Sequence, residues 1–193
     1  MKYLLASFNP SKLKEIKALL PEDLEIVLLC DIPEAMEPEE NGDTLEANAK
    51  IKAEYGYQLT GLPTISDDTG LLTESLNGMP GVYSARYAGE PQDAERNMQK
   101  LLDALQSQKN RKAEFRTVIA LQETADEVKY FTGVLKGNIA HQKQGTAGFG
   151  YDPIFIPEGD TRSLGEYTAF EKNEISHRGK ALQSLARYLK TKS

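Results

Sequence analysis

The 193-residue sequence has one cysteine, no tryptophan and only two histidines. Cys30 has no second cysteine to pair with, so an intramolecular disulfide is excluded, and no CxxC or Cys/His cluster suggests structural zinc. Because Cys30 follows the apolar run IVLL, we expect a buried, unreactive thiol. His141 has no obvious partner along the chain and is expected at the surface.

An excess of basic residues is also missing, since 29 acidic residues outnumber 23 basic ones and the net charge is −6. This charge disfavours nucleic-acid binding, although a local basic cleft stays possible. No apolar run approaches the ~18 residues of a membrane span, and the run at residues 3–6 is too short for a signal peptide. We therefore expect a cytoplasmic protein that does not bind membranes, with a single domain over residues 1–193.

The order of elements predicts a mixed α/β chain with a cleft between two lobes. Strands are expected at 3–6, 24–30, 63–66 and 154–157, and helices at about 10–20, 43–59, 91–106 and 175–190. Residues 113–121 alternate like a strand. Residues 127–140 read as its antiparallel partner, with a bend at Gly133 and a turn near Gly137.

Two stretches carry groups that suit phosphate and metal. SFNPSK, at residues 7–12, joins a strand to a helix start, where free N–H groups favour an anion, although on this stretch alone an ordinary capped helix is the simpler interpretation. In ISDDTGL, Asp67 and Asp68 follow an apparent strand end. They suit Mg²⁺ binding or activation of water, but an Asp-rich turn needs no chemistry. Glu39 and Glu40 are either solvated or share that metal.

Two further stretches carry groups that suit a nucleobase. In GTAGFGYDP, at residues 145–153, Phe149 is placed to stack on a base, which contributes ~1–3 kcal/mol. Asp152 can accept hydrogen bonds from base N–H groups. In EKNEISHRGK, Lys172, His177 and Arg178 lie near a helix start and can contact a carbonyl or phosphate. A tight loop and a solvated helix start are the alternatives. Together the four stretches describe a site for a nucleoside triphosphate with Mg²⁺.

The motifs SFNPSKLKEI, ISDDTGLLTESLNGMPGVYSARYAG, GTAGFGYDPIFIP and EKNEISHRGKAL resemble the inosine/xanthosine triphosphate pyrophosphatases, the HAM1-like family. The resemblance implies hydrolysis of ITP, dITP and XTP to monophosphate and pyrophosphate with Mg²⁺. It also implies an α/β fold with a mixed central β-sheet and flanking helices, two lobes around a nucleotide-binding cleft, and a homodimer.

The same resemblance assigns roles to individual residues. Asp68 would be the general base and, with Glu39, would hold the metal, with Asp67 supporting Asp68. The implied substrate-binding residues are Ser7, Phe8, Asn9, Pro10, Ser11, Lys12, Thr69, Phe149, Gly150, Tyr151, Asp152, Lys172, His177 and Arg178. The alternatives are a phosphatase or kinase-like transferase, which would give other products, and a nucleotide sensor without turnover.

Overall fold

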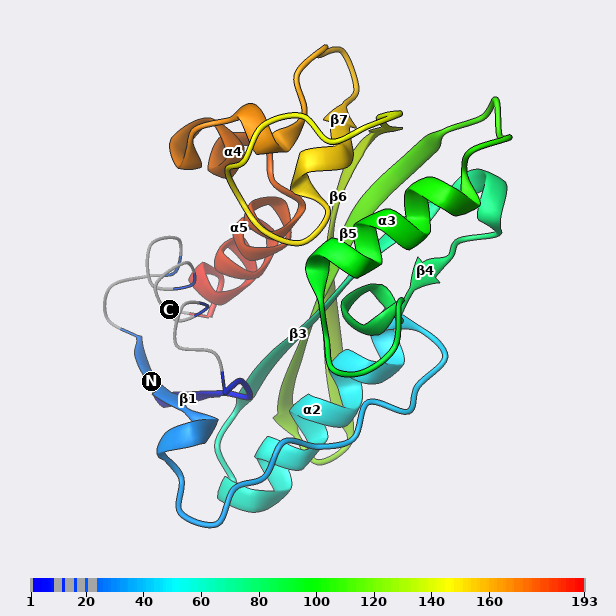
Figure 1. Ribbon diagram of the computed structural model, residues 1–193. Helices are drawn as coiled ribbons and strands as arrows, with labels where there is room; N and C mark the ends of the chain where they lie inside the picture. Colours follow the sequence, from blue (N-terminus) through cyan, green and yellow to red (C-terminus); the bar gives the residue numbers. More distant parts are fainter. Residues whose placement is uncertain (1, 9–11, 13–15, 17–19, 21–23, 193) are drawn as a thin grey trace. The chain divides into compact units, whose positions relative to one another are not determined.

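The computed structural model describes residues 2–8, 12, 16, 20 and 24–192 (Figure 1). Contacts divide the chain into two compact units. Unit 1 comprises residues 1–68, 117–133 and 178–193, and unit 2 comprises residues 69–116 and 134–177. Within the described ranges, no helix is long and apolar enough to cross a membrane.

The strands form one mixed sheet, which confirms the predicted α/β class. Its order is β2 (Glu25–Leu28), β1 (Lys2–Leu5), β3 (Thr64–Thr73), β5 (Lys112–Thr124), β6 (Glu127–Ile139) and β7 (Phe155–Pro157). A short strand, β4 (Pro80–Gly81), pairs with β3 outside this path. Strand β1 runs parallel to β2 and β3, whereas β4 is antiparallel to β3 and β7 to β6.

In unit 1, helices α2 (Leu45–Thr60) and α5 (His177–Lys190) pack on opposite faces of β1. Leu5 joins a core cluster with Leu185 of α5, while Leu4 joins one with Tyr55 of α2. Gly56 allows the close approach of α2, because a Cβ there would lie 2.7 Å from Leu4. The hydroxyl of Thr44 begins this helix by accepting a bond from the Ala47 N–H.

In unit 2, helix α3 (Ala94–Ala104) packs Met98 and Leu101 into a core with Phe115 and Phe155. A second helix, α4 (Ala169–Ile175), follows a loop rich in polar contacts. The remaining helical turns are η1 (Leu29–Asp31), η2 (Glu74–Leu76), η3 (Ser84–Arg86), η4 (Asp152–Ile154) and η5 (Leu164–Glu166).

Several local predictions were wrong. Strand β3 does not end at the acid pair but continues through Asp67 and Asp68 to Thr73. Strand β6 does not turn at Gly137, because Gly137 pairs with Pro157 and its missing side chain leaves room for Phe155. Cys30 is exposed, since β2 ends at Leu28 and the chain turns into η1.

Other expectations hold or lie outside the described residues. His141 is exposed, as predicted. The helix expected at residues 10–20 is described only at residues 12, 16 and 20. Residues 171–174, expected to be a polar stretch before the last helix, belong to α4.

Candidate functional site

The two adjacent acids of β3 serve opposite faces of the sheet. Successive strand residues point to opposite sides, so Asp67 shares a face with Ile65 and Asp68 shares a face with Ser66. Ile65 packs in the α5 cluster, whereas the Ser66 hydroxyl donates to the Ala49 carbonyl of α2 at 2.5 Å. The strand geometry therefore separates two carboxylates that the sequence places side by side.

Asp68 belongs to a buried chain of charges with Lys52 and Glu40. The Lys52 ammonium, on α2, donates to Glu40 Oε1 at 2.5 Å and to Asp68 Oδ1 at 3.2 Å. The side chains of Lys52 and Asp68 are only 9% and 11% exposed. Lys52 therefore draws an acid from the loop before α2 toward the acid of β3.

Burial and these charges set the protonation of the group. Burial raises the pKa of Asp68, and the opposing pull of Lys52 does not cancel this effect. Burial alone would lower the pKa of Lys52, but Asp68, Asp67 and Glu40 outweigh it and raise the pKa. Lys52 is therefore cationic, while Asp68 binds a proton more readily than an ordinary aspartate, as suits a general base.

One oxygen of Asp68 has no assigned partner. Asp68 Oδ2 is buried and makes no hydrogen bond among the residues that the structure describes. Mg²⁺ prefers such oxygen ligands and is held by one or two carboxylates plus substrate phosphates. No group of three or more His, Cys, Asp or Glu side chains suited to a metal occurs in the described part of the chain. The carboxylates of Asp68 and Glu40 thus fit a metal that substrate helps to hold.

Asp67 makes a separate set of contacts on the other face. Its Oδ1 accepts a bond from Lys12 at 2.7 Å, and its Oδ2 accepts one from Arg178 of α5 at 3.5 Å. Burial by itself would raise the pKa of Asp67, but Lys12, Arg178 and Lys52 hold it well below the usual range. Asp67 is thus ionised, and its hydrogen bonds go to these two cations.

The other phosphate-loop predictions are only partly described. Ser7 is buried and its N–H donates to the Leu5 carbonyl, whereas Phe8 is 36% exposed. Asn9, Pro10 and Ser11 lie outside the described residues. Thr69 lies in β3 directly after Asp68 and is half-buried.

The predicted base-binding residues of unit 2 gather around Asp152. The buried Asp152 carboxylate accepts bonds from the Phe149 N–H at 2.7 Å and from Lys172 of α4 at 2.5 Å. The Lys172 ammonium also lies 4.2 Å from the centre of the Phe149 ring, which is 66% exposed. Gly148 and Gly150 have positive φ values of 78° and 60°, which glycine adopts readily. An exposed aromatic ring is thus presented beside a lysine and a carboxylate.

Tyr151 and His177 are anchored within unit 2. The Tyr151 hydroxyl donates to the Ser84 carbonyl at 2.8 Å, and burial raises its pKa. The ring of His177 stacks on Phe115 with centroids 4.8 Å apart. Tyr151 therefore ties this loop to η3.

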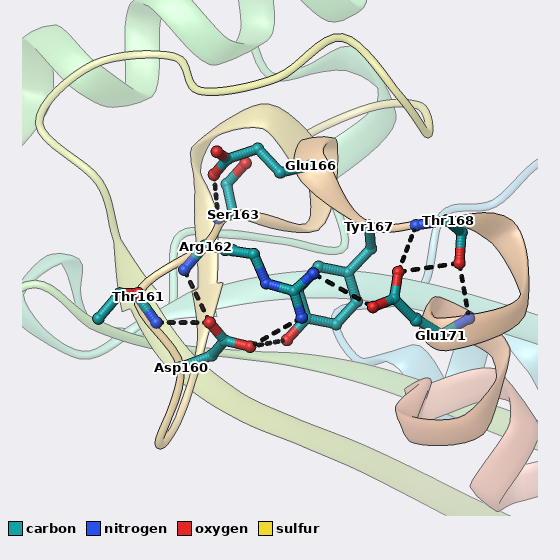
Figure 2. Close-up of polar contacts among 8 residues, drawn as sticks. All are labelled: Asp160, Thr161, Arg162, Ser163, Glu166, Tyr167, Thr168 and Glu171. Atoms are coloured by element: carbon teal, nitrogen blue, oxygen red, sulfur yellow. Dashed lines mark hydrogen bonds and ion pairs between the residues drawn. The ribbon is translucent and has the colours of Figure 1, made fainter.

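A network of polar side chains precedes α4, the helix that carries Lys172 (Figure 2). The Arg162 guanidinium bridges Asp160, at 3.3 Å, and Glu171, at 3.1 Å, and lies over the Tyr167 ring. Glu171 in turn accepts from the backbone N–H and the hydroxyl of Thr168, which caps α4. These contacts define the start of the helix that carries Lys172.

The chain was compared with known proteins. The model of the Ham1 family matches residues 3–188. The chain belongs to the Ham1 family. A relative from Christiangramia forsetii, named dITP/XTP pyrophosphatase, is 48% identical over 98% of this chain and 99% of its own length. A relative of the same name from Bacillus subtilis is 42% identical over 96% of both chains.

Solved structures from the Ham1 family have the same fold. The Ham1 protein of Staphylococcus aureus superposes with a TM-score of 0.94 at 36% identity, over 100% of both chains. The nucleoside-triphosphatase, or dITP/XTP pyrophosphatase, of Mycobacterium abscessus has a TM-score of 0.85 at 44% identity, covering 96% of this chain and 98% of that one.

Lys52 was not identified from the sequence, and Glu39 was predicted as the metal ligand beside Asp68, with Glu40 as its neighbour in the same acidic loop. Asn48, Lys52 and Gly56 are spaced four residues apart and are all buried on one side of α2. The sequence did hold a signal for Lys52, which lies on the same side of the helix as Ala49 and Ala53. A lysine at such a position indicates a charged partner, because lysine is almost never fully buried unless it is paired. Glu39 is exposed, whereas Glu40 contacts Lys52.

Proposed function

We propose that this chain hydrolyses non-standard purine nucleoside triphosphates, such as dITP, ITP and XTP, to the monophosphate and pyrophosphate. The observation that carries the proposal is the buried Asp68, with one oxygen on Lys52 and the other without a hydrogen-bond partner in the described chain. Relatives that match almost the whole chain are named dITP/XTP pyrophosphatase, which supports the same activity.

The phosphates are assigned to the cations of unit 1. Lys12 and Lys52 are the described lysines nearest the acid pair, at 2.7 Å from Asp67 and 3.2 Å from Asp68. Mg²⁺ fits Asp68 with Glu40, which we propose in place of Glu39 because Glu40 is the acid that Lys52 draws toward Asp68. Bound there, Mg²⁺ supplies positive charge for phosphate oxygens and a leaving pyrophosphate.

Asp68 acts as the general base in this proposal. Its raised pKa lets its carboxylate accept a proton from a water molecule that attacks the α-phosphorus. Lys52, held by two carboxylates, keeps its charge and orients the Asp68 Oδ1 atom. Lys12 neutralises charge that develops on phosphate oxygens.

The base is assigned to unit 2. Phe149 offers its exposed ring for stacking, and Gly150 and Asp152 line the same loop. Lys172 and His177 of unit 2, and Arg178, which belongs to unit 1, are proposed donors to the 6-keto oxygen or the phosphates. Adenine presents an amino donor in place of that oxygen, and leaving such donors unpaired costs ~1–3 kcal/mol. The keto group is thus the proposed basis of selectivity against ATP.

A substrate panel with pyrophosphate as the readout tests the activity. ITP, dITP and XTP with Mg²⁺ are expected to release pyrophosphate, with kcat/KM about tenfold or more above that of ATP, which corresponds to ~1.4 kcal/mol. Asp68→Asn is expected to abolish turnover while the protein stays folded. Orthophosphate as the first product, or equal kcat/KM for ITP and ATP, would contradict the proposal. The homodimer and the cleft between two lobes stay predictions.

A further inference from the structure

We propose that Asp67 is a positioning residue that holds Lys12 and Arg178 in place for the phosphate tail of the substrate. This inference rests on the proposed function. Asp67 contacts both cations, one through each of its oxygens, at 2.7 Å and 3.5 Å. It therefore acts on substrate through two other side chains and not by touching it.

The three charged groups meet in apolar surroundings. The side chains of Asp67, Arg178 and Lys12 are 7%, 17% and 24% exposed. The apolar residues Leu5, Ile16, Ile65, Ile119 and Leu182 line a cavity of only about 10 Å³ with them. This volume is at the lower limit of the ~10–15 Å³ that one water needs, so at most one water fits beside these charges and ion pairing is their main stabilisation.

Positioning has a physical benefit for anion binding. Lysine and arginine are long side chains with much rotamer entropy, which binding must otherwise remove. Lys12 and Arg178 also repel each other, and the carboxylate between them offsets that repulsion. Asp67 therefore keeps two long side chains ordered before a phosphate arrives, so ligand binding has less ordering to do.

The direction in which KM changes in Asp67→Asn distinguishes a positioning role from a purely electrostatic one. Asp67→Asn removes a negative charge beside an anion site. Coulomb attraction alone would then tighten triphosphate binding and lower KM. If Asp67 positions the cations, KM rises instead. A catalytic role would lower kcat and leave KM unchanged.

The first test measures KM and kcat for ITP with Mg²⁺ in Asp67→Asn. We expect KM to rise about tenfold or more while kcat changes by less than about threefold, which is the pattern for lost uniform binding. Asp67→Glu keeps the charge and should recover part of the loss in KM. Ser184→Ala, a change on α5 at a residue whose hydroxyl donates to the Lys180 carbonyl, is the control and should leave KM within about twofold. A lowered KM, an unchanged KM, or a loss confined to kcat overturns the proposal.

A second comparison does not need the single variant to fold. The double variant Lys12→Met, Arg178→Met is compared with the triple variant that also carries Asp67→Asn. If Asp67 acts through these two cations, the two proteins have KM values within about threefold, because the third change has little left to remove. If the triple variant loses more than that, Asp67 acts independently of both cations and the proposal is wrong.

Calorimetry with inorganic pyrophosphate separates this proposal from the proposed function. Pyrophosphate should bind Asp67→Asn about tenfold more weakly than the wild type, a difference of ~1.4 kcal/mol. If the wild type binds pyrophosphate and shows this loss but hydrolyses no ITP, the activity is wrong and the positioning role stands. If ITP is hydrolysed and Asp67→Asn binds pyrophosphate as well as the wild type, the positioning role is wrong.

Discussion

Replacing Lys52 with methionine is expected to destabilise the protein strongly when no divalent cation is present. The Lys52 ammonium pairs with both Asp68 and Glu40, and removing it takes this cation away from both carboxylates. At 3.2 Å and an effective dielectric constant of about 20, its attraction to Asp68 alone is about 5 kcal/mol. Desolvation of the ammonium offsets part of this gain.

The net effect follows from measured cases of the same kind. Removing one partner of a buried ion pair typically destabilises a protein by ~3–5 kcal/mol, because the other charge stays buried. In a chain of this size each kcal/mol lowers Tm by roughly 2–4 °C, so Lys52→Met should lower Tm by about 10 °C. Thermal unfolding in chelator measures this change.

The matched control is Lys50→Met on the same helix. Lys50 is 47% exposed, and its i,i+4 pair with Glu54 at 3.4 Å should contribute only ~0.3–0.5 kcal/mol. Adding Mg²⁺ should stabilise Lys52→Met more than the wild type, because the cation reduces the repulsion between Asp68 and Glu40. The reasoning is refuted if the two variants are equally stable in chelator, or if Mg²⁺ stabilises Lys52→Met no more than wild type.

Four further outcomes are expected. Glu40→Gln should raise the Mg²⁺ concentration needed for half-maximal activity about tenfold, whereas Glu39→Gln should leave it unchanged. The pKa of Asp67 in the folded protein lies below its ordinary value of 3.8, so its ionised form stabilises the fold above about pH 4 and this stabilisation declines as the pH falls further. The difference in unfolding free energy between wild type and Asp67→Asn should therefore shrink below about pH 4, as acid unfolding can measure. Arg162→Ala should raise KM for ITP about threefold with kcat unchanged, because it loosens the start of α4. An α,β-imido analogue of ITP should bind at least about tenfold more weakly in chelator than with Mg²⁺, as calorimetry can measure.

The sequence predicted where chemistry-bearing residues lie but not which of them meet. Periodicity was enough to place α3, because Met98 and Leu101 recur at helical spacing and one side of the helix is buried. The length of β3 was predicted wrongly, because aspartate is disfavoured in strands. Strand pairing and the cations from distant parts of the chain override that local preference at Asp67 and Asp68.

The choice between Glu39 and Glu40 shows a second limit. Both residues lie in one acidic loop, and nothing local separates them. The distinction depends on Lys52, which lies 12 residues further along and reaches Glu40 because α2 packs against the sheet. A contact of this kind depends on tertiary packing, which no single stretch of sequence contains.

The charges around the acid pair explain why adjacent aspartates are tolerated and what they still lack. Strand alternation directs Asp67 toward α5 and Asp68 toward α2, and each side provides cations. Lys12, Arg178 and Lys52 then balance Asp67, Asp68 and Glu40, three charges against three, so this group offers no net positive charge to a triphosphate. A bound divalent cation is the simplest supplier of that charge, and the buried Asp68 oxygen without a hydrogen-bond partner in the described chain is where it fits. The lysines and arginine therefore offset the three carboxylates, and under the proposed function a bound divalent cation would strengthen binding of the highly charged substrate.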